Sequence, residues 1–291
     1  MSKNIPELDM QRVMTLIELA LAEDLDERGD TTSQAVIPAD AKASGVLYAK
    51  SDCVIAGLAV AEAVFKKLDP ACEFTAVLKD GDFCPAKTVI ARIVGNAVAM
   101  LTAERTALNF IQRLCGVATM AHSYAAEVKD YSMQILDTRK TTPGWRNLEK
   151  YAVAVGGASN HRIGLFDRIM IKDNHREMAG MEGAGGILRS VERARKRYPD
   201  LEVEVEVDTL EELDEALKSN CEYILLDNMS TEMMAEAVRR NQNRAKLEAS
   251  GNITIERLRE IAAAGVDFAS SGALTHSVKS SDISLDIKPL K

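Results

Sequence analysis

The chain has 291 residues, of which 46% are hydrophobic and 27% charged, and its formal net charge at pH 7 is −8. This length allows two domains or one large α/β unit with a sizeable buried core. The negative balance argues against a general nucleic-acid-binding protein and makes any local cluster of positive charge more informative. The N-terminus has no basic segment leading into an apolar run, and no stretch approaches about 18 uninterrupted apolar residues, so we expect neither a signal peptide nor a membrane span.

The five cysteines are scattered along the chain without a CxxC pair, and none of the four histidines belongs to an HxxxH pair. This pattern argues against a disulfide framework, a structural zinc and a histidine metal site. Reduced thiols of this kind are typical of a cytoplasmic protein.

The first third of the chain predicts a small layer of helices and strands. Apolar residues at helical spacing predict a helix over residues 9–25, which the polar, glycine-containing stretch 26–33 ends. A shorter helix is predicted over 59–68 and a long one from about 98 to 128. Short apolar runs predict strands at 45–49, 53–56, 74–78 and 88–93.

Beyond residue 130 the pattern changes to alternating strands and helices. The predicted strands cover residues 134–137, 168–172, 202–207, 223–227, 246–249 and 266–269. The predicted helices cover residues 186–197, 210–218, 231–240 and 254–264. This alternation is typical of repeated βα units around a parallel sheet, and an α/β barrel is its natural closure.

In such barrels the active site lies at the carboxyl ends of the strands. Here strand after strand ends on charged or small polar residues, in the segments 137–140, 172–175, 206–208, 227–228, 250–252 and 270–272. The same region is locally basic, because residues 139–176 contain eight Lys/Arg and three Asp/Glu. The residues that we place around an anionic ligand are Arg139, Lys140, His161, Arg162 and Lys172. Arginine suits carboxylates and phosphates because its planar fork donates two parallel hydrogen bonds, whereas the alternative is a solvated charged face.

Two further features fit a phosphorylated ligand. Glu206 and Asp227 end consecutive predicted strands, so their carboxylates could hold a Mg²⁺ that is bound to substrate phosphates, or could instead pair with the basic cluster. Small-residue loops at 249–252 and 270–273 follow the last two strands. Glycine lets backbone N–H groups approach a phosphate closely, although a plain turn is the alternative for each loop.

Together these motifs resemble the quinolinate phosphoribosyltransferase family, also called carboxylating nicotinate-nucleotide pyrophosphorylase. The resemblance rests on Glu-Arg-Thr-Ala-Leu-Asn at 104–109, Asp-Thr-Arg-Lys-Thr-Thr-Pro-Gly at 137–144, and Gly-Gly at 156–157 followed by Asn-His-Arg at 160–162. It continues in the segments 172–175, 204–207, 226–228 and 272–277, in the family's order and spacing.

The resemblance implies an incomplete α/β barrel over residues 116–274. It also implies an N-terminal α/β sandwich domain over 1–115, to which the tail 275–291 returns. The implied reaction transfers phosphoribose from phosphoribosyl pyrophosphate to quinolinate with loss of carbon dioxide and forms nicotinate mononucleotide, a step of NAD biosynthesis. It further implies a cytoplasmic homodimer in which Arg105 reaches the neighbouring subunit's active site.

The site roles carried over by the resemblance follow the segments above. The two quinolinate carboxylates would be held by Arg105, Arg139, His161 and Arg162, and Thr138 would be a further substrate-binding residue. Lys140 and Lys172 would face the pyrophosphate, and Glu206 and Asp227 would contact the ribose hydroxyls and Mg²⁺, with no organic cofactor. The 5′-phosphate would be cradled by Ser250, Gly251, Ser271 and Gly272. Asn252 departs from the family pattern, in which many members have a second glycine, and Ser271 occupies a variable position.

Other functions are compatible with the same strand ends. A related protein of the same fold could transfer phosphoribose to another acceptor, and the set of Arg105, Arg139 and Arg162 argues against this because it suits a dicarboxylate. A barrel aldolase could use Lys140 or Lys172 to form a Schiff base. A non-enzymatic binding module is disfavoured because so many strand ends carry reactive residue types.

Overall fold

The structure is a computed structural model that describes residues 5–290, and the chain folds into two compact units. The first unit contains the described residues up to 122 together with 142–157 and 277–290. The second contains residues 123–141 and 158–276. The domain boundaries expected from the sequence differ from these units mainly at 142–157, which they assign to the barrel.

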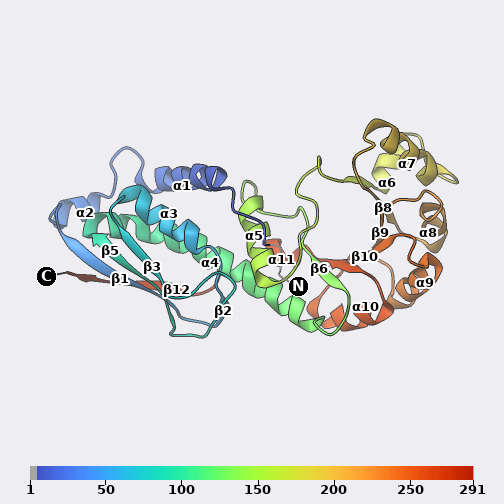
Figure 1. Ribbon diagram of the computed structural model, residues 1–291. Coiled ribbons are helices and arrows are strands. Elements are labelled where there is room, and N and C mark those ends of the chain that lie inside the picture. The colour runs from blue at the N-terminus through green and yellow to red at the C-terminus, as the bar shows by residue number, and fades with distance from the viewer. Residues whose placement is uncertain (1–4, 291) are drawn as a thin grey trace. The chain divides into compact units, whose positions relative to one another are not determined.

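The first unit is built on an antiparallel sheet with the strand order β12-β1-β5-β3 (Figure 1). Its strands are β1 (Lys42–Ala49), β3 (Glu73–Ala76), β5 (Val89–Asn96) and β12 (Ile283–Pro289). Alternate residues of β1 are buried, as expected for a strand with one face against a core. The short strands β2 (Cys53–Val54) and β4 (Phe83–Cys84) form a separate pair. Because β12 pairs with β1, the C-terminal tail returns to the N-terminal unit, as the resemblance implies.

The helices of the first unit are α1 (Met10–Leu25), α2 (Thr31–Val36), α3 (Leu58–Leu68), α5 (Arg146–Gly156) and most of α4 (Ala97–Glu127). Asp9 caps α1 by accepting a hydrogen bond from the Arg12 amide, and Val13, Ile17 and Leu21 form its buried stripe. These positions follow the predicted helical spacing closely.

The segment 142–157 is tied to the first unit by specific side chains. The carboxylate of Glu149 is completely buried and accepts a hydrogen bond from Arg113 Nη2 at 2.8 Å. The Trp145 ring stacks on Phe110, with their centroids 4.8 Å apart. A buried ion pair and an aromatic contact therefore hold α5 against α4, even though the flanking segments of the chain belong to the second unit.

The second unit contains a parallel sheet of six strands in the order β6-β11-β10-β9-β8-β7 (Figure 1). The strands are β6 (Gln134–Leu136), β7 (Ile169–Ile171), β8 (Val203–Val207), β9 (Tyr223–Asp227), β10 (Lys246–Ser250) and β11 (Phe268–Ser270). Within the described residues β6 and β7 remain the edges of this sheet, so the barrel is incomplete, as expected.

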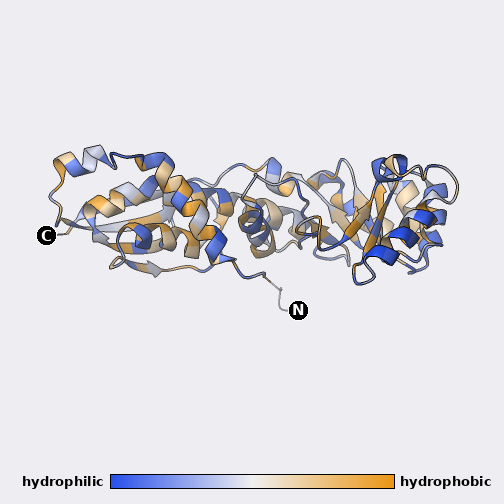
Figure 2. Ribbon diagram, turned by 90° about the horizontal axis from the view of Figure 1, so that it is seen from above, coloured by the Kyte–Doolittle hydropathy of each residue, from blue (hydrophilic) through white to orange (hydrophobic). Residues whose placement is uncertain are grey.

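Helices alternate with these strands and cover the outside of the sheet (Figure 1). They are α7 (Gly186–Arg197), α8 (Leu210–Ala216), α9 (Thr231–Asn241) and α10 (Leu258–Ala264), with the shorter α6 (Asp173–Met178), η1 (Ile255–Arg257) and α11 (Ala273–His276) beside them. In Figure 2 the strands are mainly hydrophobic and the outer helices carry most of the hydrophilic residues. No helix within residues 5–290 has both the length and the apolar character needed to cross a bilayer.

Two buried charges interrupt the apolar strands of this unit. Parallel strands covered on both faces are normally continuous apolar runs. Glu204 on β8 and Glu248 on β10 are nevertheless completely buried. Side chains alternate along a strand, so Glu204 and Glu206 lie on one face of β8 and Val203 and Val205 on the other.

Candidate active site

A pocket of about 660 Å³ lies at the carboxyl ends of the strands of the second unit. Ten of the thirteen site residues expected from the sequence line it: Thr138, Arg139, Lys140, His161, Arg162, Lys172, Glu206, Asp227, Ser250 and Gly251. These residues come from the ends of five strands and from the loop that carries His161 and Arg162, so only the parallel sheet brings them together. Of the remaining three, Ser271 and Gly272 follow β11, and Arg105 is exposed on α4 in the first unit.

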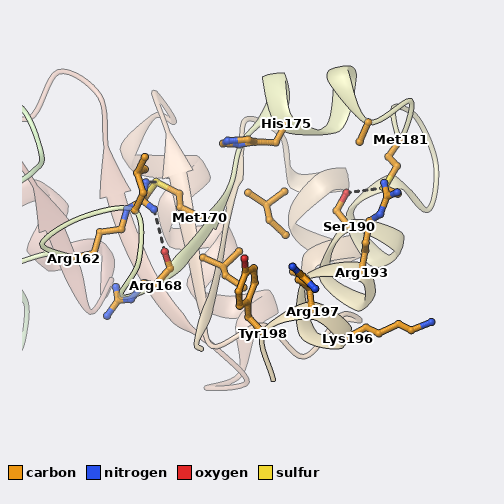
Figure 3. A pocket seen from close by; sticks show the side chains of 15 residues that line it. Arg162, Arg168, Met170, His175, Met181, Ser190, Arg193, Lys196, Arg197 and Tyr198 are labelled. Carbon is orange, nitrogen blue, oxygen red and sulfur yellow. Dashed lines mark hydrogen bonds between the residues drawn. The ribbon is translucent and has the colours of Figure 1, made fainter. Parts of the chain in front are cut away.

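Arg162 is held in place at both ends. Its backbone N–H donates to His161 Nδ1 at 2.7 Å, and Nη1 of its guanidinium donates to the Arg168 carbonyl oxygen at 3.0 Å. Nη2 contacts Met170 Sδ at 3.5 Å (Figure 3). Burial lowers the pKa of Arg162, and the positive charge of nearby Arg139 lowers it further. Two cations that repel each other in this way favour a ligand with two negative charges.

The loop that carries His161 and Arg162 is anchored by Asp137. This carboxylate is completely buried, and it accepts hydrogen bonds from Asn160 Nδ2 at 2.7 Å and from the His161 backbone N–H at 2.8 Å. Ser159 also forms a β-bridge with Leu136. Asp137 is part of the motif found in the sequence, but the sequence analysis gave it no role of its own.

The His161 ring is almost completely buried beside two carboxylates. Its Nε2 lies 3.2 Å from Glu204 Oε2 and 3.3 Å from Glu248 Oε2, and only 7% of the residue is exposed. Burial lowers the pKa of the imidazole, but the two carboxylates outweigh this and raise it to about 9. Both ring nitrogens therefore have partners within the protein.

Lys172 and Glu206 form an ion pair across the ends of β7 and β8, with Glu206 only 14% exposed. Burial raises the pKa of Glu206, and the Lys172 ammonium offsets part of this effect. Asp227 accepts a hydrogen bond from Asn228 Nδ2 at 2.8 Å and is half-buried. The sequence left open whether Glu206 pairs with a residue of the basic cluster, and the structure shows that it pairs with Lys172. Two carboxylates at adjacent strand ends also match the oxygen ligands that Mg²⁺ prefers.

The conformation of the loop after β10 strongly favours a glycine at its centre. Gly251 has φ +83°, and a Cβ atom there would lie 2.1 Å from Asn228 Oδ1. Asn252, which replaces the second glycine of many family members, also adopts the left-handed region, with φ 51°. Asparagine tolerates this conformation better than other non-glycine residues, so the departure from the family pattern leaves the loop geometry possible.

The loop after β11 approaches Lys140. A Cβ on Gly272 would lie 2.8 Å from Lys140 Cδ. Ser271 has both of its donors engaged, because its hydroxyl donates to the Ile253 carbonyl at 3.1 Å and its backbone N–H to the Leu136 carbonyl at 3.0 Å. Ser271 thus links the two small-residue loops, and its contact with a phosphate stays a prediction.

We expect Gly251→Ala to raise the KM for phosphoribosyl pyrophosphate at least about tenfold, because the added methyl would displace Asn228 and open the loop. Gly180→Ala is the matched control: Gly180 also has positive φ (+63°), but a Cβ there would meet no atom within 4 Å. Both variants should lose about 1–2 kcal/mol of unfolding free energy through backbone strain alone. Steady-state kinetics and urea unfolding of the two variants measure the difference, and equal KM values would contradict the role of this loop.

A second pocket, of about 770 Å³, lies behind Arg162 and Met170, which line both cavities. Apolar residues such as Leu165 and Ile171 are part of its lining. Arg193 and Arg197 line it from the helix α7 (Figure 3). The carboxylates of the first pocket do not line it. Beside it several large apolar side chains are exposed, namely Ile163, Leu165, Phe166 and Met178.

Sequence reasoning missed the roles of Asp137, Glu204 and Glu248. A signal for the two glutamates existed, since Glu204 lies two residues from Glu206, and Glu248 two residues from Ser250, on strands with an alternating pattern. Their complete burial, however, depends on strands that are distant in sequence.

An incomplete α/β barrel with a cation-rich pocket and small-residue loops at its strand ends defines a class of enzyme that binds anionic, phosphorylated substrates. Models of two domains of one family match this chain. The quinolinate phosphoribosyl transferase C-terminal domain matches residues 117–286, and the N-terminal domain of the same enzyme matches residues 30–115. The chain therefore belongs to the quinolinate phosphoribosyl transferase family.

Individual relatives are similar over nearly the whole chain. The chloroplastic nicotinate-nucleotide pyrophosphorylase [carboxylating] of Arabidopsis thaliana is 41% identical over 97% of this chain and 84% of that protein. A probable enzyme of the same name from Synechocystis is 45% identical over 87% of this chain and 85% of its own length. The solved nicotinate-nucleotide pyrophosphorylase of Francisella tularensis superposes with a TM-score of 0.91 at 38% identity and covers 98% of this chain and 99% of that one.

Proposed function

We propose that this protein is a decarboxylating quinolinate phosphoribosyltransferase. It transfers phosphoribose from phosphoribosyl pyrophosphate to quinolinate and releases nicotinate mononucleotide, pyrophosphate and carbon dioxide, as a step of NAD biosynthesis. Membership of the family and the names of its relatives support this reaction. The observation that carries it in the structure is the pocket in which Arg139, Arg162 and Lys172 meet Glu206 and Asp227.

The pocket divides into regions that suit the two substrates. Arg139 and Arg162, with Thr138, lie where a planar dicarboxylate would receive paired hydrogen bonds. Lys140 and Lys172 supply positive charge for the pyrophosphate. Ser250 and Gly251, with Gly272 near Lys140, suit the 5′-phosphate because backbone N–H groups can approach it closely.

Glu206 and Asp227 are the residues that would hold Mg²⁺, since both are carboxylates and the partly buried Glu206 already requires a cation beside it. Bound there, the ion would neutralise part of the charge of phosphoribosyl pyrophosphate. The pKa of Glu206 is raised by burial, which is consistent with a group that gains from an additional positive charge.

The chemistry then depends mainly on positioning and electrostatics. Arg139 and Arg162 would hold quinolinate with its ring nitrogen towards the ribose C1, and Lys140 and Lys172 would offset the charge that grows on the leaving pyrophosphate. Once the nitrogen is alkylated its positive charge stabilises the electron pair left behind by carbon dioxide, and that carbon is then protonated. No organic cofactor is needed for this step.

Release of labelled carbon dioxide from carboxyl-labelled quinolinate tests the proposal. We expect release to require both phosphoribosyl pyrophosphate and Mg²⁺, and to stop with EDTA. Nicotinate serves as the competing acceptor: if it gave pyrophosphate while quinolinate gave no carbon dioxide, the chain would be a relative that uses another acceptor. Inactivation by borohydride with substrate, at Lys140 or Lys172, would instead indicate a Schiff-base aldolase.

We also propose that the protein is a cytoplasmic homodimer to which each subunit contributes Arg105 for its neighbour's site. Arg105 is exposed on α4, and the apolar side chains of Ile163, Leu165 and Phe166 are at least half exposed beside the site. Covering such a surface with a second copy would bury it. The five free, buried cysteines fit a reducing compartment, although the Arabidopsis relative is named as chloroplastic.

A further inference from the structure

Next to Arg162 the chain forms a buried cluster of one histidine and two glutamates, His161, Glu204 and Glu248. Glu204 and Glu248 belong to β8 and β10, which are separated by β9, and neither is exposed to solvent. The Nε2 of His161 lies between them, 3.2 Å from one carboxylate and 3.3 Å from the other. Burying charged groups costs desolvation free energy unless the charges are paired, so the contacts within this cluster are functionally informative.

The other side of the ring faces the main chain. The backbone N–H of Arg162 donates to His161 Nδ1 at 2.7 Å, which requires a lone pair on that nitrogen. The two carboxylates raise the pKa of the ring and so favour a second ring proton, but a proton on Nδ1 would abolish the 2.7 Å hydrogen bond from Arg162. We take this hydrogen bond as decisive, and it places the single ring proton on Nε2, between the two carboxylates. In this arrangement the imidazole has no nitrogen left with which to donate to a substrate carboxylate.

The charges around the cluster agree with this assignment. Arg168 Nη1 lies 3.6 Å from Glu204 Oε2, and the Arg168 guanidinium stacks over the Tyr223 ring at 3.9 Å. Burial raises the pKa of Glu248, and the negative charge of Glu204 raises it further.

We infer that His161, Glu204 and Glu248 form a positioning cluster that fixes the main chain of Arg162 in the quinolinate site, rather than a direct contact to the substrate. This inference rests on the proposed function, and it differs from the carboxylate-binding role that the family resemblance gives to His161. The two glutamates fix the ring through Nε2, and the ring fixes the Arg162 backbone through Nδ1. Asp137 holds the His161 backbone as well, so the main chain that carries Arg162 is restrained from both sides.

Kinetics of matched variants test the positioning role. We expect His161→Ala and Glu248→Ala each to raise the KM for quinolinate about 10- to 100-fold, because a misplaced Arg162 loses its aligned contact. The KM for phosphoribosyl pyrophosphate should stay within about threefold. Glu248→Gln should restore most of what Glu248→Ala loses, because an amide keeps the size of the side chain and an acceptor oxygen next to His161 Nε2.

Glu222→Gln is the control for general loss of packing. Glu222 accepts hydrogen bonds from Arg195 and from the backbone N–H of Val203 on β8, but it does not line the pocket. We expect this variant to lose stability without a selective change in the quinolinate KM. If Glu248→Ala raised both KM values equally, or if Glu248→Gln failed to restore quinolinate binding in a folded protein, the positioning role would be refuted.

A nuclear magnetic resonance measurement tests the cluster independently of activity. With ¹⁵N-labelled histidine, and His161 assigned by comparison with His161→Asn, we expect Nε2 to carry the proton and Nδ1 to lack it from pH 6 to 8. Adding quinolinate should leave this pattern unchanged. A proton on Nδ1, a shift to direct bonding with quinolinate, or a stoichiometric metal ion retained at the three side chains would each overturn the inference. Because the measurement uses the protein without substrate, it remains decisive even if quinolinate is not the acceptor.

Discussion

Arg139→Ala is expected to raise the KM for quinolinate about 100-fold while changing the KM for phosphoribosyl pyrophosphate much less. A bidentate contact between a guanidinium and a carboxylate consists of two charge-assisted hydrogen bonds, whose loss costs about 3 kcal/mol, and every 1.4 kcal/mol is about tenfold in affinity. The loss should be selective because Arg139 follows β6, whereas the loop proposed for the phosphate follows β10.

Arg139→Lys is the sharper comparison for this prediction. Lysine keeps the positive charge but donates as a point charge, so it should recover only a small part of the lost affinity. Circular dichroism and thermal unfolding should show an intact fold for both variants, since Arg139 is partly exposed at the pocket. Unchanged kinetics in Arg139→Ala would remove this residue from the site.

The second large effect is expected from mixing two inactive variants. Arg105→Ala and Arg139→Ala should each be nearly inactive at ordinary substrate concentrations. If Arg105 serves the neighbouring subunit, a mixed dimer contains one complete site, formed by the intact Arg105 of one chain and the intact Arg139 of the other. Random exchange of subunits should then restore about a quarter of the wild-type activity, because half of the dimers are mixed and each has one intact site of two.

Activity measured after subunits have been unfolded and refolded together checks this result, with each variant refolded alone as the control. Restoration should appear only in the co-refolded sample, and the protein should sediment as a dimer. If Arg105 acted within its own chain, neither variant could complement the other and the mixture would remain inactive.

Much of the fold follows from local patterns in the sequence. The helix predicted over 9–25 is α1, the one predicted over 186–197 is α7, and the long helix expected from about 98 to 128 is α4. The strands of the parallel sheet also lie within a few residues of their predicted positions. These elements were predictable because helical spacing and short apolar runs depend only on residues that are neighbours along the chain.

Short or unusual elements were not predictable in the same way. The sequence analysis missed α2, α5, α6, α11, β4 and β12. Four of these six have at most six residues, too few to establish a periodicity, and β12 becomes a strand only by pairing with β1, from Ala43 opposite Pro289 to Ala49 opposite Ile283. The placement of α5 depends on the contact of Glu149 with Arg113, which cannot be predicted from a local sequence pattern.

By itself, the sequence determined which residue types end each strand, and it therefore predicted a cation-rich site with two carboxylates and two glycine loops. Only the tertiary structure decided that ten of these side chains line one pocket, that Asp137 anchors the His161 loop, and that Glu204 and Glu248 enclose the His161 ring. The physical reason is that burial and pairing of charges arise from strands brought together by the sheet, whereas the propensity to form a helix or a strand lies in the local chain.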